Sequence, residues 1–545
     1  MNTRLISLAA SMLLTVAGCG GGSGSGGGQP PPPPPPPITT AEAFQFLNQA
    51  TFGATAAEAQ RVIDMRYEAW IDDQLQKPAS LQLPHVRSLP LPQFMGQLQA
   101  DRVDIWFRNA LHGDDQLRQR VAFALSEIMV VSQLGVLNNQ PYSLASYYDM
   151  LARNAFGNYR DLIEDVTLHP AMGVYLSMLG NEKPDPVNNI RPDENYAREL
   201  MQLFSIGLVE LNLDGTVRTD GQGQPIPTYN QSIIEGFAHV YTGWTYAGSP
   251  VFRGARATLT NQVIPMQLWQ NFHDTGAKSL LNGFVVPAGQ SGDRDLAMAL
   301  DNIFNHPNIG PFMATRLIER LTTSNPAPQY VERVARVFND NGQGERGDLG
   351  AVVRAILLDP AARTSSNPDT GGKIKEPLLR LTQLFKAYNA TSQSGRYPLG
   401  FAYVIFGQGP LQASHVFNFF SPFYAPPGEI SDRGLVAPEL EIATEYLNTY
   451  VTNYFFLQSF VLNQTNPGLQ PDDVYIDFSE EMAVAADADA LINMVADKLL
   501  GGVISETLRN EIAGMLALVP DTDAAIRAAE TIYFVTTSPE YAYQR

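Results

Sequence analysis

Residues 116–131, with the sequence QLRQRVAFALSEIMVV, decide the fold class, because they are apolar on nearly every side of a helix. This pattern is typical of a helix that is buried all round. From Thr40 onward the periodicity stays mostly helical, without a regular run of alternating strands or a longer repeat. We therefore predict a mainly α protein, consisting of a large single helical body with long irregular loops and a few short β-hairpins.

Two further helices with one apolar face are predicted downstream. Asp193 is a suitable N-cap for the first helix, and the second spans residues 231–244. The apolar stripe of the first helix is Tyr196, Leu200, Leu203 and Gly207, and that of the second is Ile233, Phe237, Val240 and Trp244. Several later helices begin with proline near the first turn, where a missing amide N–H costs little.

Two irregular stretches interrupt the helices, at residues 211–228 and 247–292. The first contains Asp214-Gly215 and Asp220-Gly221, which predict one or two hairpins because Asp-Gly supplies the positive φ of tight turns. Long ordered loops on a helical scaffold usually carry function. No linker follows Pro37, so residues 39–545 are predicted to form one domain with a soft subdivision near residue 365.

The composition is acidic and favours a packed core. The chain has 55 acidic and 36 basic residues, and its formal net charge is −19 at pH 7. Nucleic-acid affinity depends on Lys and Arg that neutralise phosphates, so this balance argues against a nucleic-acid partner. Hydrophobic residues make up 44% of the chain, which argues against wholesale disorder. A single cysteine excludes an intrachain disulfide framework and a zinc–thiolate cluster.

The N-terminus has the features of an export signal. Arg4 precedes an apolar run that ends in Val16-Ala17-Gly18-Cys19, and this run is too short to span a bilayer. The ending resembles the bacterial lipobox, which implies that residues 1–18 are removed as a lipoprotein signal peptide and that Cys19 is lipidated. Gly20 after the cysteine favours the outer membrane by resemblance to known sorting rules. The alternative is an ordinary cleaved signal with an incidental cysteine.

Residues 19–38 are predicted to be a spacer between the lipid and the body. Only Gly and Ser occur at positions 20–28, and eight consecutive prolines follow at positions 30–37. A flexible coil therefore leads into a polyproline II rod of roughly 25 Å. A ligand for a proline-binding domain is the alternative interpretation.

A series of colinear motifs is similar to the bacterial domain-of-unknown-function family 1800. Its central blocks are residues 192–201, PDENYARELM, and residues 241–244, YTGW. Further blocks extend from about residue 41 to the C-terminus. They include Ala50-Thr51-Phe52-Gly53, Tyr67-Glu68-Ala69-Trp70, His169-Pro170-Ala171-Met172, residues 273–278, His306-Pro307-Asn308, Ser324-Asn325-Pro326, Lys375-Glu376-Pro377, residues 416–420 and Ser538-Pro539-Glu540-Tyr541.

This resemblance implies a large exported bacterial protein of unknown function. It also implies a sulfatase-like exported partner, because genes of the family often lie beside a gene for such a protein. The chain departs from one pattern of the family, in which histidines follow the block that is Arg120-Val121-Ala122-Phe123 here. Ser126, Glu127 and Ile128 follow this block instead.

The strongest candidate for catalysis is the start of the helix after Asp193. Helical spacing pairs Glu194 with Arg198 and Asn195 with Glu199. We expect the arginine to keep one carboxylate ionised while burial raises the pKa of the other, which is the split that general acid and general base roles need. The alternative is a helix cap with structural ion pairs.

Glu127 is a second candidate, because it interrupts an apolar run and lies seven residues from Arg120 on one helical face. A buried charge needs a partner. We consider both residues as binding residues, and a structural Arg–Glu pair is the alternative.

His273 and Asp274, with Lys278, form a third cluster in the loop-rich stretch. An adjacent carboxylate can orient and charge an imidazole, so His273 and Asp274 are candidate catalytic residues and Lys278 a candidate binding residue. The alternative is a turn in which Asp274 caps the next helix. Glu235 and His239 are four residues apart and form a weaker candidate pair for a metal, with solvated surface as the alternative.

Aromatic residues flank the same loops and suit sugar stacking, although such residues are more often part of a core. The group consists of Trp244, Tyr246, Trp269 and Phe272.

We expect a lipid-anchored cell-envelope protein that binds or processes an extracytoplasmic polymer by carboxylate acid/base chemistry. We predict that the polymer is a carbohydrate. If the protein is an enzyme, we expect a hydrolase. The sequence lacks a Gly-x-Ser-x-Gly elbow, a phosphate-binding Gly-Lys loop and a His-Glu-x-x-His helix, so no cofactor or metal is assigned. The first alternative is a non-catalytic scaffold or companion of the sulfatase-like partner. The second is a metalloenzyme that uses His169, His273 or the pair Glu235 and His239.

Overall fold

The computed structural model describes residues 36–363 and 371–545. The predicted signal peptide, Cys19 and most of the predicted spacer lie outside these residues. Residues 38–545 form one compact unit. The predicted subdivision near residue 365 falls in the segment 364–370, which also lies outside the described residues.

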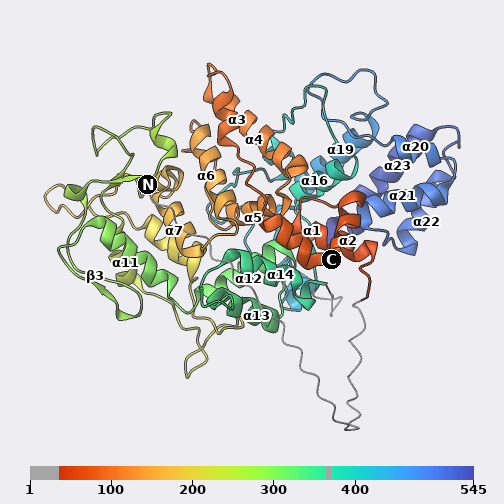
Figure 1. Ribbon diagram of the computed structural model, residues 1–545. Helices are drawn as coiled ribbons and strands as arrows, with labels where there is room; N and C mark the ends of the chain where they lie inside the picture. Colours follow the sequence, from red (N-terminus) through yellow and green to blue (C-terminus); the bar gives the residue numbers. More distant parts are fainter. Residues whose placement is uncertain (1–35, 364–370) are drawn as a thin grey trace, which may run out of the picture. The chain divides into compact units, whose positions relative to one another are not determined.

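The first part of the chain is helical, and α5 lies at its centre (Figure 1). Helices α1, α2, α4, α6 and α12 all pack against α5. The ring of Phe123 on α5 contacts Phe52 and Trp106, and all three side chains are buried. The helices of this part are α1 (Thr40–Ala50), α2 (Ala56–Leu75), α3 (Leu83–Ser88), α4 (Met95–His112), α5 (Gln116–Ser126), α6 (Pro141–Asn154), α7 (Tyr159–Leu168) and α8 (Pro170–Tyr175).

The prediction that residues 116–131 form one buried helix is correct for burial but wrong for length. The helix ends at Ser126, and Glu127 begins a turn whose amide N–H points to the carbonyls of Phe123 and Ala124. Residues 127–131 are buried without being helical. An apolar run therefore indicated burial here, and the polar Glu127 marks the place where the helix stops.

The middle of the chain holds the elements that position the candidate site. Helix α9 (Asn195–Glu199) continues directly into a π-helix, η1 (Leu200–Ser205), and α10 (Gln231–Val240) follows after a hairpin. The wider π turn shifts the buried face, so Phe204 is buried in place of Leu203 of the predicted stripe. Helix α10 ends four residues before the predicted Trp244, which belongs to a strand.

The prediction of a mainly α fold with a few short hairpins is confirmed. The strands of the described residues form three antiparallel two-stranded sheets, β1 with β2, β3 with β4 and β5 with β6. They are β1 (Trp244–Thr245), β2 (Gln267–Leu268), β3 (Lys278–Ser279), β4 (Val285–Val286), β5 (Lys373–Ile374) and β6 (Tyr543–Gln544). Short 3-10 helices accompany them: η2 (Asn261–Val263), η3 (Gln270–Phe272) and η4 (Leu281–Gly283).

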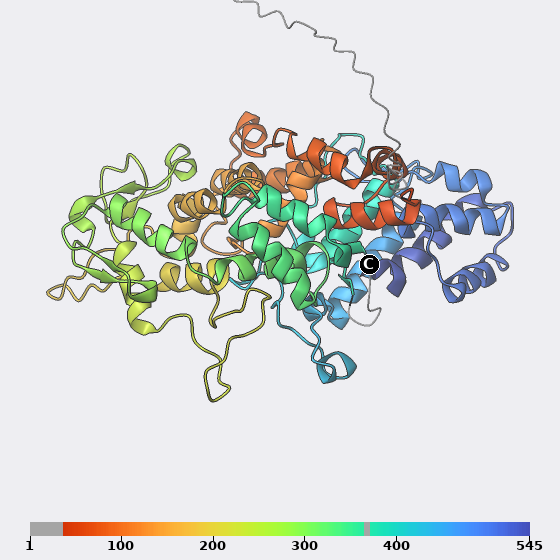
Figure 2. The same cartoon turned by 60° about the horizontal axis from the view of Figure 1, so that its bottom comes forward.

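The predicted hairpins at residues 211–228 are present as isolated β-bridges, which join Leu211 to Val217 and Thr219 to Pro225. Gly215 has the positive φ that the first Asp-Gly turn requires. In the second turn the positive φ occurs at Gly223, two residues after the predicted Gly221. Figure 2 shows this segment extending away from the helices.

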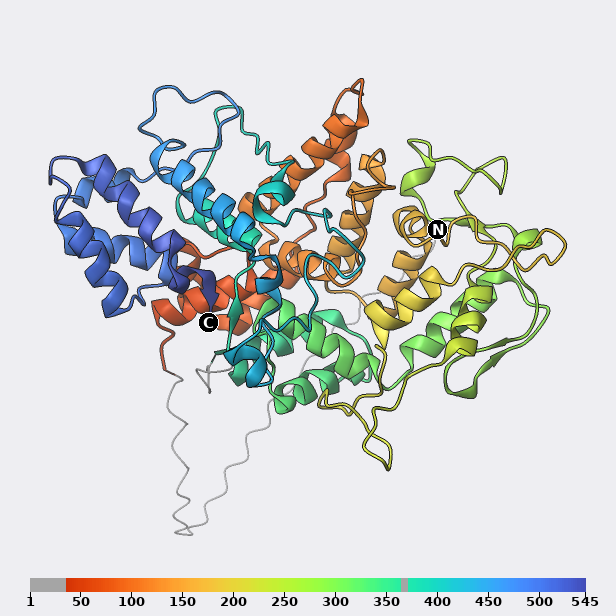
Figure 3. The ribbon, with the colours of Figure 1, turned by 180° about the vertical axis from the view of Figure 1, so that it is seen from behind.

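The second half of the chain is also helical, and its last helices gather at one end of the unit (Figure 3). Helix α23 packs against α19, α20, α21 and α22. No helix in the described ranges has the length and hydropathy needed to cross a membrane. The elements are α11 (Gly292–Phe304), α12 (Ile309–Leu321), α13 (Pro328–Asn339), α14 (Leu349–Leu358), α15 (Pro360–Arg363), α16 (Pro377–Ala387), α17 (Ala402–Phe406), α18 (Glu429–Asp432), η5 (Pro438–Ile442), α19 (Glu445–Phe460), α20 (Ser479–Val484), α21 (Ala488–Leu500), α22 (Glu506–Leu516), α23 (Ala524–Thr537) and α24 (Pro539–Ala542).

Candidate functional site

Helix α10 brings two of the predicted clusters onto one face. Gln231, Glu235 and His239 follow each other at intervals of four residues, so they form a row along the partly exposed side of the helix. The opposite side, which includes Phe237, is buried. We call this row and the side chains that contact it the α10 row.

Gly236 fixes the position of α10 against β3. A Cβ atom at this position would overlap the backbone carbonyl of Ser279, so the close approach requires glycine. The helix begins at Asn230, whose side chain accepts a hydrogen bond from the amide of Ile233 at 3.2 Å. The cap at Asn230 is a local contact, the contact with Ser279 is long-range, and together they hold the row in place.

Glutamate side chains from two helices meet at the N-terminal end of the α10 row. The amide nitrogen Nε2 of Gln231 donates to both carboxylate oxygens of Glu194, at 2.9 and 3.0 Å, and lies 3.4 Å from Oε1 of Glu235. Glu194 also forms the predicted ion pair with Arg198, at 3.0 Å. The sequence therefore predicted the Glu194–Arg198 pair correctly, and the structure adds Gln231 and Glu235 to it.

Glu199 lies beneath this surface in a different environment. Its side chain is 8% exposed, and its Oε2 atom has no hydrogen-bond partner among the described residues. Burial raises the pKa of Glu199, and the charge of Arg198 opposes this increase. No side-chain hydrogen bond among the described residues joins Glu199 to Asn195, whose side chain is exposed. The two carboxyl groups therefore lie in the unlike environments that we predicted. Arg198 pairs with Glu194, while burial favours the protonated form of Glu199.

Tyr229 accompanies Glu199 and was not predicted from the sequence. Its hydroxyl group is buried and has no partner among the described residues. Burial raises the pKa of Tyr229 to about 12, and the nearby charge of Glu199 contributes to the increase. Glu199 and Tyr229, which lie close enough for their charges to interact, thus each carry a buried oxygen atom without a hydrogen-bond partner among the described residues.

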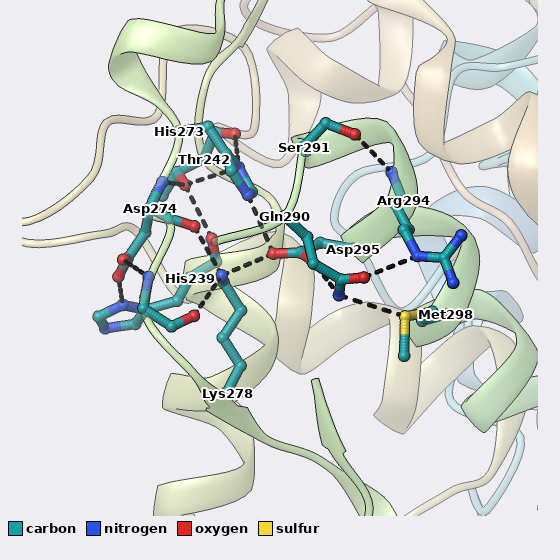
Figure 4. A network of polar contacts seen from close by, with 12 residues as sticks. His239, Thr242, His273, Asp274, Lys278, Gln290, Ser291, Arg294, Asp295 and Met298 are labelled. Atoms are coloured by element: carbon teal, nitrogen blue, oxygen red, sulfur yellow. Dashed lines mark hydrogen bonds and ion pairs between the residues drawn. The ribbon is translucent and has the colours of Figure 1, made fainter. Parts of the chain in front are cut away.

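At the C-terminal end of the row, His239 contacts Asp274 through a short hydrogen bond from its Nδ1 atom to Oδ2 (Figure 4). This bond lowers the pKa of Asp274 to about 2. Asp274 also accepts a hydrogen bond from the amide of Gly276 at 2.7 Å, so it closes a tight turn and does not cap a helix. The Nε2 atom of His239 has no partner among the described residues and is available to a ligand.

His273, a predicted catalytic residue, has a fully buried side chain with partners on both ring nitrogens. Its Nδ1 atom lies 3.0 Å from the carbonyl oxygen of Thr242, and its Nε2 atom lies 3.0 Å from Asp295 (Figure 4). Lys278 is buried as well, and it donates to Asp295 at 2.6 Å and to two backbone carbonyls. These residues stabilise the loop that carries Asp274.

The aromatic residues divide into core and surface. Trp244 is 3% exposed and therefore presents no ring for sugar stacking, in line with the alternative of a core residue. Trp269 and Phe272 remain partly exposed, and Phe272 stacks on Phe252 with a centroid distance of 4.1 Å. Phe272 lies two residues before Asp274, which places a partly exposed aromatic ring near this end of the row.

Glu127 and Arg120 belong to a separate, buried ionic network. The amide of Gln408 joins the carboxyl groups of Glu127 and Glu376, because its Nε2 atom donates to both, at 3.2 and 2.5 Å. Arg320 lies 3.9 Å from Glu127, whereas Arg120 donates to the backbone carbonyl of Arg320 at 2.6 Å. Lys373 pairs with Glu376 at 3.2 Å. Both Glu127 and Arg120 are buried, so the prediction of a binding role is replaced by the structural alternative, with Arg320 as the cation nearest to Glu127.

Burial raises the pKa of Glu127, and the adjacent Glu376 raises it further. The pKa of Glu376 is lowered, because the charges of Lys373 and Arg120 outweigh its own burial. These surroundings favour the protonated form of Glu127 and the ionised form of Glu376.

The histidines considered as metal ligands have other partners. His169 is buried, and its ring nitrogens contact Ser146 at 3.0 Å and the amide of Ala171 at 3.1 Å. Burial lowers the pKa of His169 to about 3. Within the described ranges, no group of three or more His, Cys, Asp and Glu side chains has an arrangement suited to a metal ion.

The family model described as "Protein of unknown function (DUF1800)" matches residues 45–543. No curated protein and no solved structure matches the chain.

Proposed function

The chain belongs to the DUF1800 family, and from this premise we propose that it is a lipid-anchored cell-envelope protein that binds and hydrolyses an extracytoplasmic carbohydrate polymer along the α10 row. The proposal rests on one observation, which is that Glu194 and Glu235 meet at Gln231 while the buried Glu199 lies on the adjacent α9, so three carboxyl groups in unlike environments belong to two helices that pack together. Glu194 is ion-paired, Glu235 is exposed, and Glu199 is buried with an unpartnered oxygen.

Hydrolysis of a glycosidic bond needs one protonated and one ionised carboxyl group. Burial favours the protonated form of Glu199, so we assign it the role of general acid, which donates its proton to the leaving oxygen as the C–O bond breaks. Glu194, next to Arg198, takes the role of general base and accepts a proton from the attacking water. The water oxygen then forms the new bond to the sugar.

The remaining part of the row suits binding. Gln231 and His239 are separated by about 12 Å along the helix, which is long enough for a polymer to contact both ends. At the far end, the free Nε2 atom of His239 and the partly exposed rings of Phe272 and Trp269 offer a hydrogen bond and stacking surfaces to a sugar. The acidic balance of the chain favours a substrate other than nucleic acid.

The test is an activity screen of the full-length protein, purified in detergent, against purified sacculi, chitin and a β-glucan, with release of reducing ends as the readout. We expect turnover on at least one polymer and a loss of at least 100-fold in Glu199→Gln, because general acid catalysis commonly contributes a factor of about 10² to 10⁴. Glu210→Gln is the matched control, since it removes a carboxylate that pairs with Arg218 on the hairpin. Its activity is expected to equal that of the wild type.

Two outcomes argue against this function. Turnover that survives in Glu199→Gln excludes the assigned general acid. Absence of turnover on all polymers, together with a stoichiometric sulfatase-like protein in the detergent extract, favours the role of a non-catalytic companion.

A further inference from the structure

A cavity of about 310 Å³ lies beside α3 and α4, and no residue of the α10 row lines it. This volume is at the lower end of the range for small-molecule sites. The walls combine apolar side chains, among them Leu89, Pro90 and Leu98, with charged side chains of both signs. The cavity is therefore suited to a small ligand that has both apolar and charged groups.

The charges follow one face of α4 in a fixed order. Asp101 and Asp104 come first, and Arg108 follows one turn after Asp104, so the face changes from negative to positive over about 6 Å. Arg108 is exposed and makes no hydrogen bond or ion pair with any described residue. Its guanidinium group is thus free to receive an anion.

The negative end is held in place by the protein itself. Asp104 is 2% exposed, accepts the amide N–H of Tyr397 at 2.6 Å and lies 3.3 Å from Arg396. Asp101 pairs with Arg396 through Oδ1 at 2.5 Å, and its Oδ2 atom has no partner within the described chain. Burial raises the pKa of Asp101, and the charge of Arg396 opposes this increase. This preorganised carboxylate therefore presents one free oxygen at the cavity wall.

His85 completes the wall without adding charge at neutral pH. Burial lowers the pKa of its imidazole, and the neighbouring Arg108 lowers it further. The charged groups that face the cavity are thus two carboxylates and two guanidinium groups, of which Arg396 is already paired.

We propose that this cavity binds a short peptide with free termini, of about two residues. The ammonium group pairs with Asp101, the carboxylate pairs with Arg108, and an apolar side chain contacts Leu89, Pro90 and Leu98. Asp101 and Arg108 are seven residues apart, or about 10 Å along the helix, and an extended dipeptide spans at most about 7 Å. The long side chain of Arg108, which has no partner among the described residues, covers the difference. The site lies outside the proposed hydrolytic centre and does not depend on it.

The test is isothermal titration calorimetry of the full-length protein in detergent with the dipeptide Ala-Leu, its N-acetyl form and its C-terminal amide. We expect Ala-Leu to bind at one site and each blocked form to bind at least tenfold more weakly. In Arg108→Gln the free acid and the amide are expected to bind equally, and in Asp101→Asn the free and acetylated peptides are expected to bind equally.

Arg87→Gln is the matched control, because Arg87 is an exposed arginine on the neighbouring α3 that does not line the cavity. Arg108→Gln removes an exposed side chain without protein partners, so the variant retains the fold. Failure of Ala-Leu to bind, equal binding of the blocked peptides, or an equal loss in Arg87→Gln would each overturn the proposal.

Discussion

Glu199 and Glu194 are five residues apart, yet their surroundings differ in the way that acid–base catalysis requires. Glu194 lies at the surface beside Arg198 and Gln231, whereas Glu199 is buried next to Tyr229. One turn of helix thus separates a solvated carboxylate from a desolvated one. Glu194 is the N-cap residue that precedes α9, whereas Glu199 is the last residue of α9, so their side chains lie in different surroundings.

The environment of Glu199 predicts the pH dependence of the proposed activity. Because burial raises the pKa of Glu199, the protonated acid persists to a higher pH than an ordinary glutamic acid. We expect kcat/KM to stay high above the ordinary pKa and then to decrease as the pH rises through the raised value. A pH profile of kcat/KM measures this basic limb. A rate that keeps increasing with pH up to 9 would rule out Glu199 as the acid.

The raised pKa of Glu127, which lies next to Glu376, predicts that the stability of the protein depends on pH. The pKa of Glu127 is raised in the folded state, so its contribution is fully present below the pKa of unfolded glutamate, 4.5, and is lost as the pH rises through the folded value. One additional proton in the folded state changes the free energy of unfolding by about 1.4 kcal/mol per pH unit. We expect stability to decrease from pH 5 upward.

Glu127→Gln mimics the protonated acid and is expected to remove most of this slope. Urea unfolding at pH 5, 6, 7 and 8 measures it. Glu332→Gln, which changes an exposed glutamate on α13, serves as the control and should keep the wild-type slope. An unchanged slope in Glu127→Gln would contradict the claim that the raised pKa of Glu127 causes the pH dependence.

At the scale of elements, Gly236 decides whether α10 can lie against β3. Any side chain there would overlap the carbonyl of Ser279, so Gly236→Ala forces the two elements apart. We expect a loss of about 1–3 kcal/mol in stability from this overpacking, together with a loss of polymer binding, because Asp274 precedes β3 and no longer reaches His239. Thermal unfolding and a polymer pull-down measure both effects.

Gly221→Ala is the control for this substitution, since a Cβ at that loop position has no neighbour within 4 Å. It should leave both properties unchanged. A fully stable Gly236→Ala protein that still binds polymer would contradict the role assigned to the contact between α10 and β3.

Elements with a strong periodic pattern were predictable from the sequence, but their ends were not. Residues 116–131 indicated a buried helix at the centre of the fold, and α5 occupies that place. The only sign of the end at Ser126 was the single polar residue Glu127, because residues 128–131 are as apolar and as buried as the helix before them. The π turn of η1 was also hidden, since an inserted residue shifts the buried face without changing the composition.

The candidate site was predictable where its contacts are local. Glu194 and Arg198 are four residues apart on one helix, so their ion pair follows from spacing. His273 and Asp274 are adjacent in sequence, yet their side chains have different partners, and Asp274 contacts His239 instead. That contact depends on how the loop folds back onto α10, which spacing does not report. No sequence pattern indicated that Tyr229 or Gln231 belongs to the site.

At the scale of the whole molecule, the proposed place of action depends on the N-terminal segment, which lies outside the described residues. The proposed anchor is the lipid on Cys19, and no helix of the described part has the properties of a membrane span. We expect Cys19→Ser to move the protein from the membrane fraction to the soluble fraction and to abolish incorporation of labelled palmitate.

Fractionation of cells followed by immunoblotting measures this change. Ser23→Ala, in the adjacent Gly/Ser stretch, is the control and should remain with the membrane. Wild-type protein that takes up no palmitate would show that the alternative, an ordinary cleaved signal, applies.

The central claim is that the protein binds and hydrolyses the polymer along the α10 row. Hydrogen–deuterium exchange of the full-length protein, with and without sacculi, chitin or a β-glucan, tests it most directly. The account predicts slower amide exchange in residues 194–199, 229–240 and 272–276 when a bound polymer is present, with little change in the helices at the C-terminal end. Protection confined to other segments, with exchange in these three unchanged, would contradict the account.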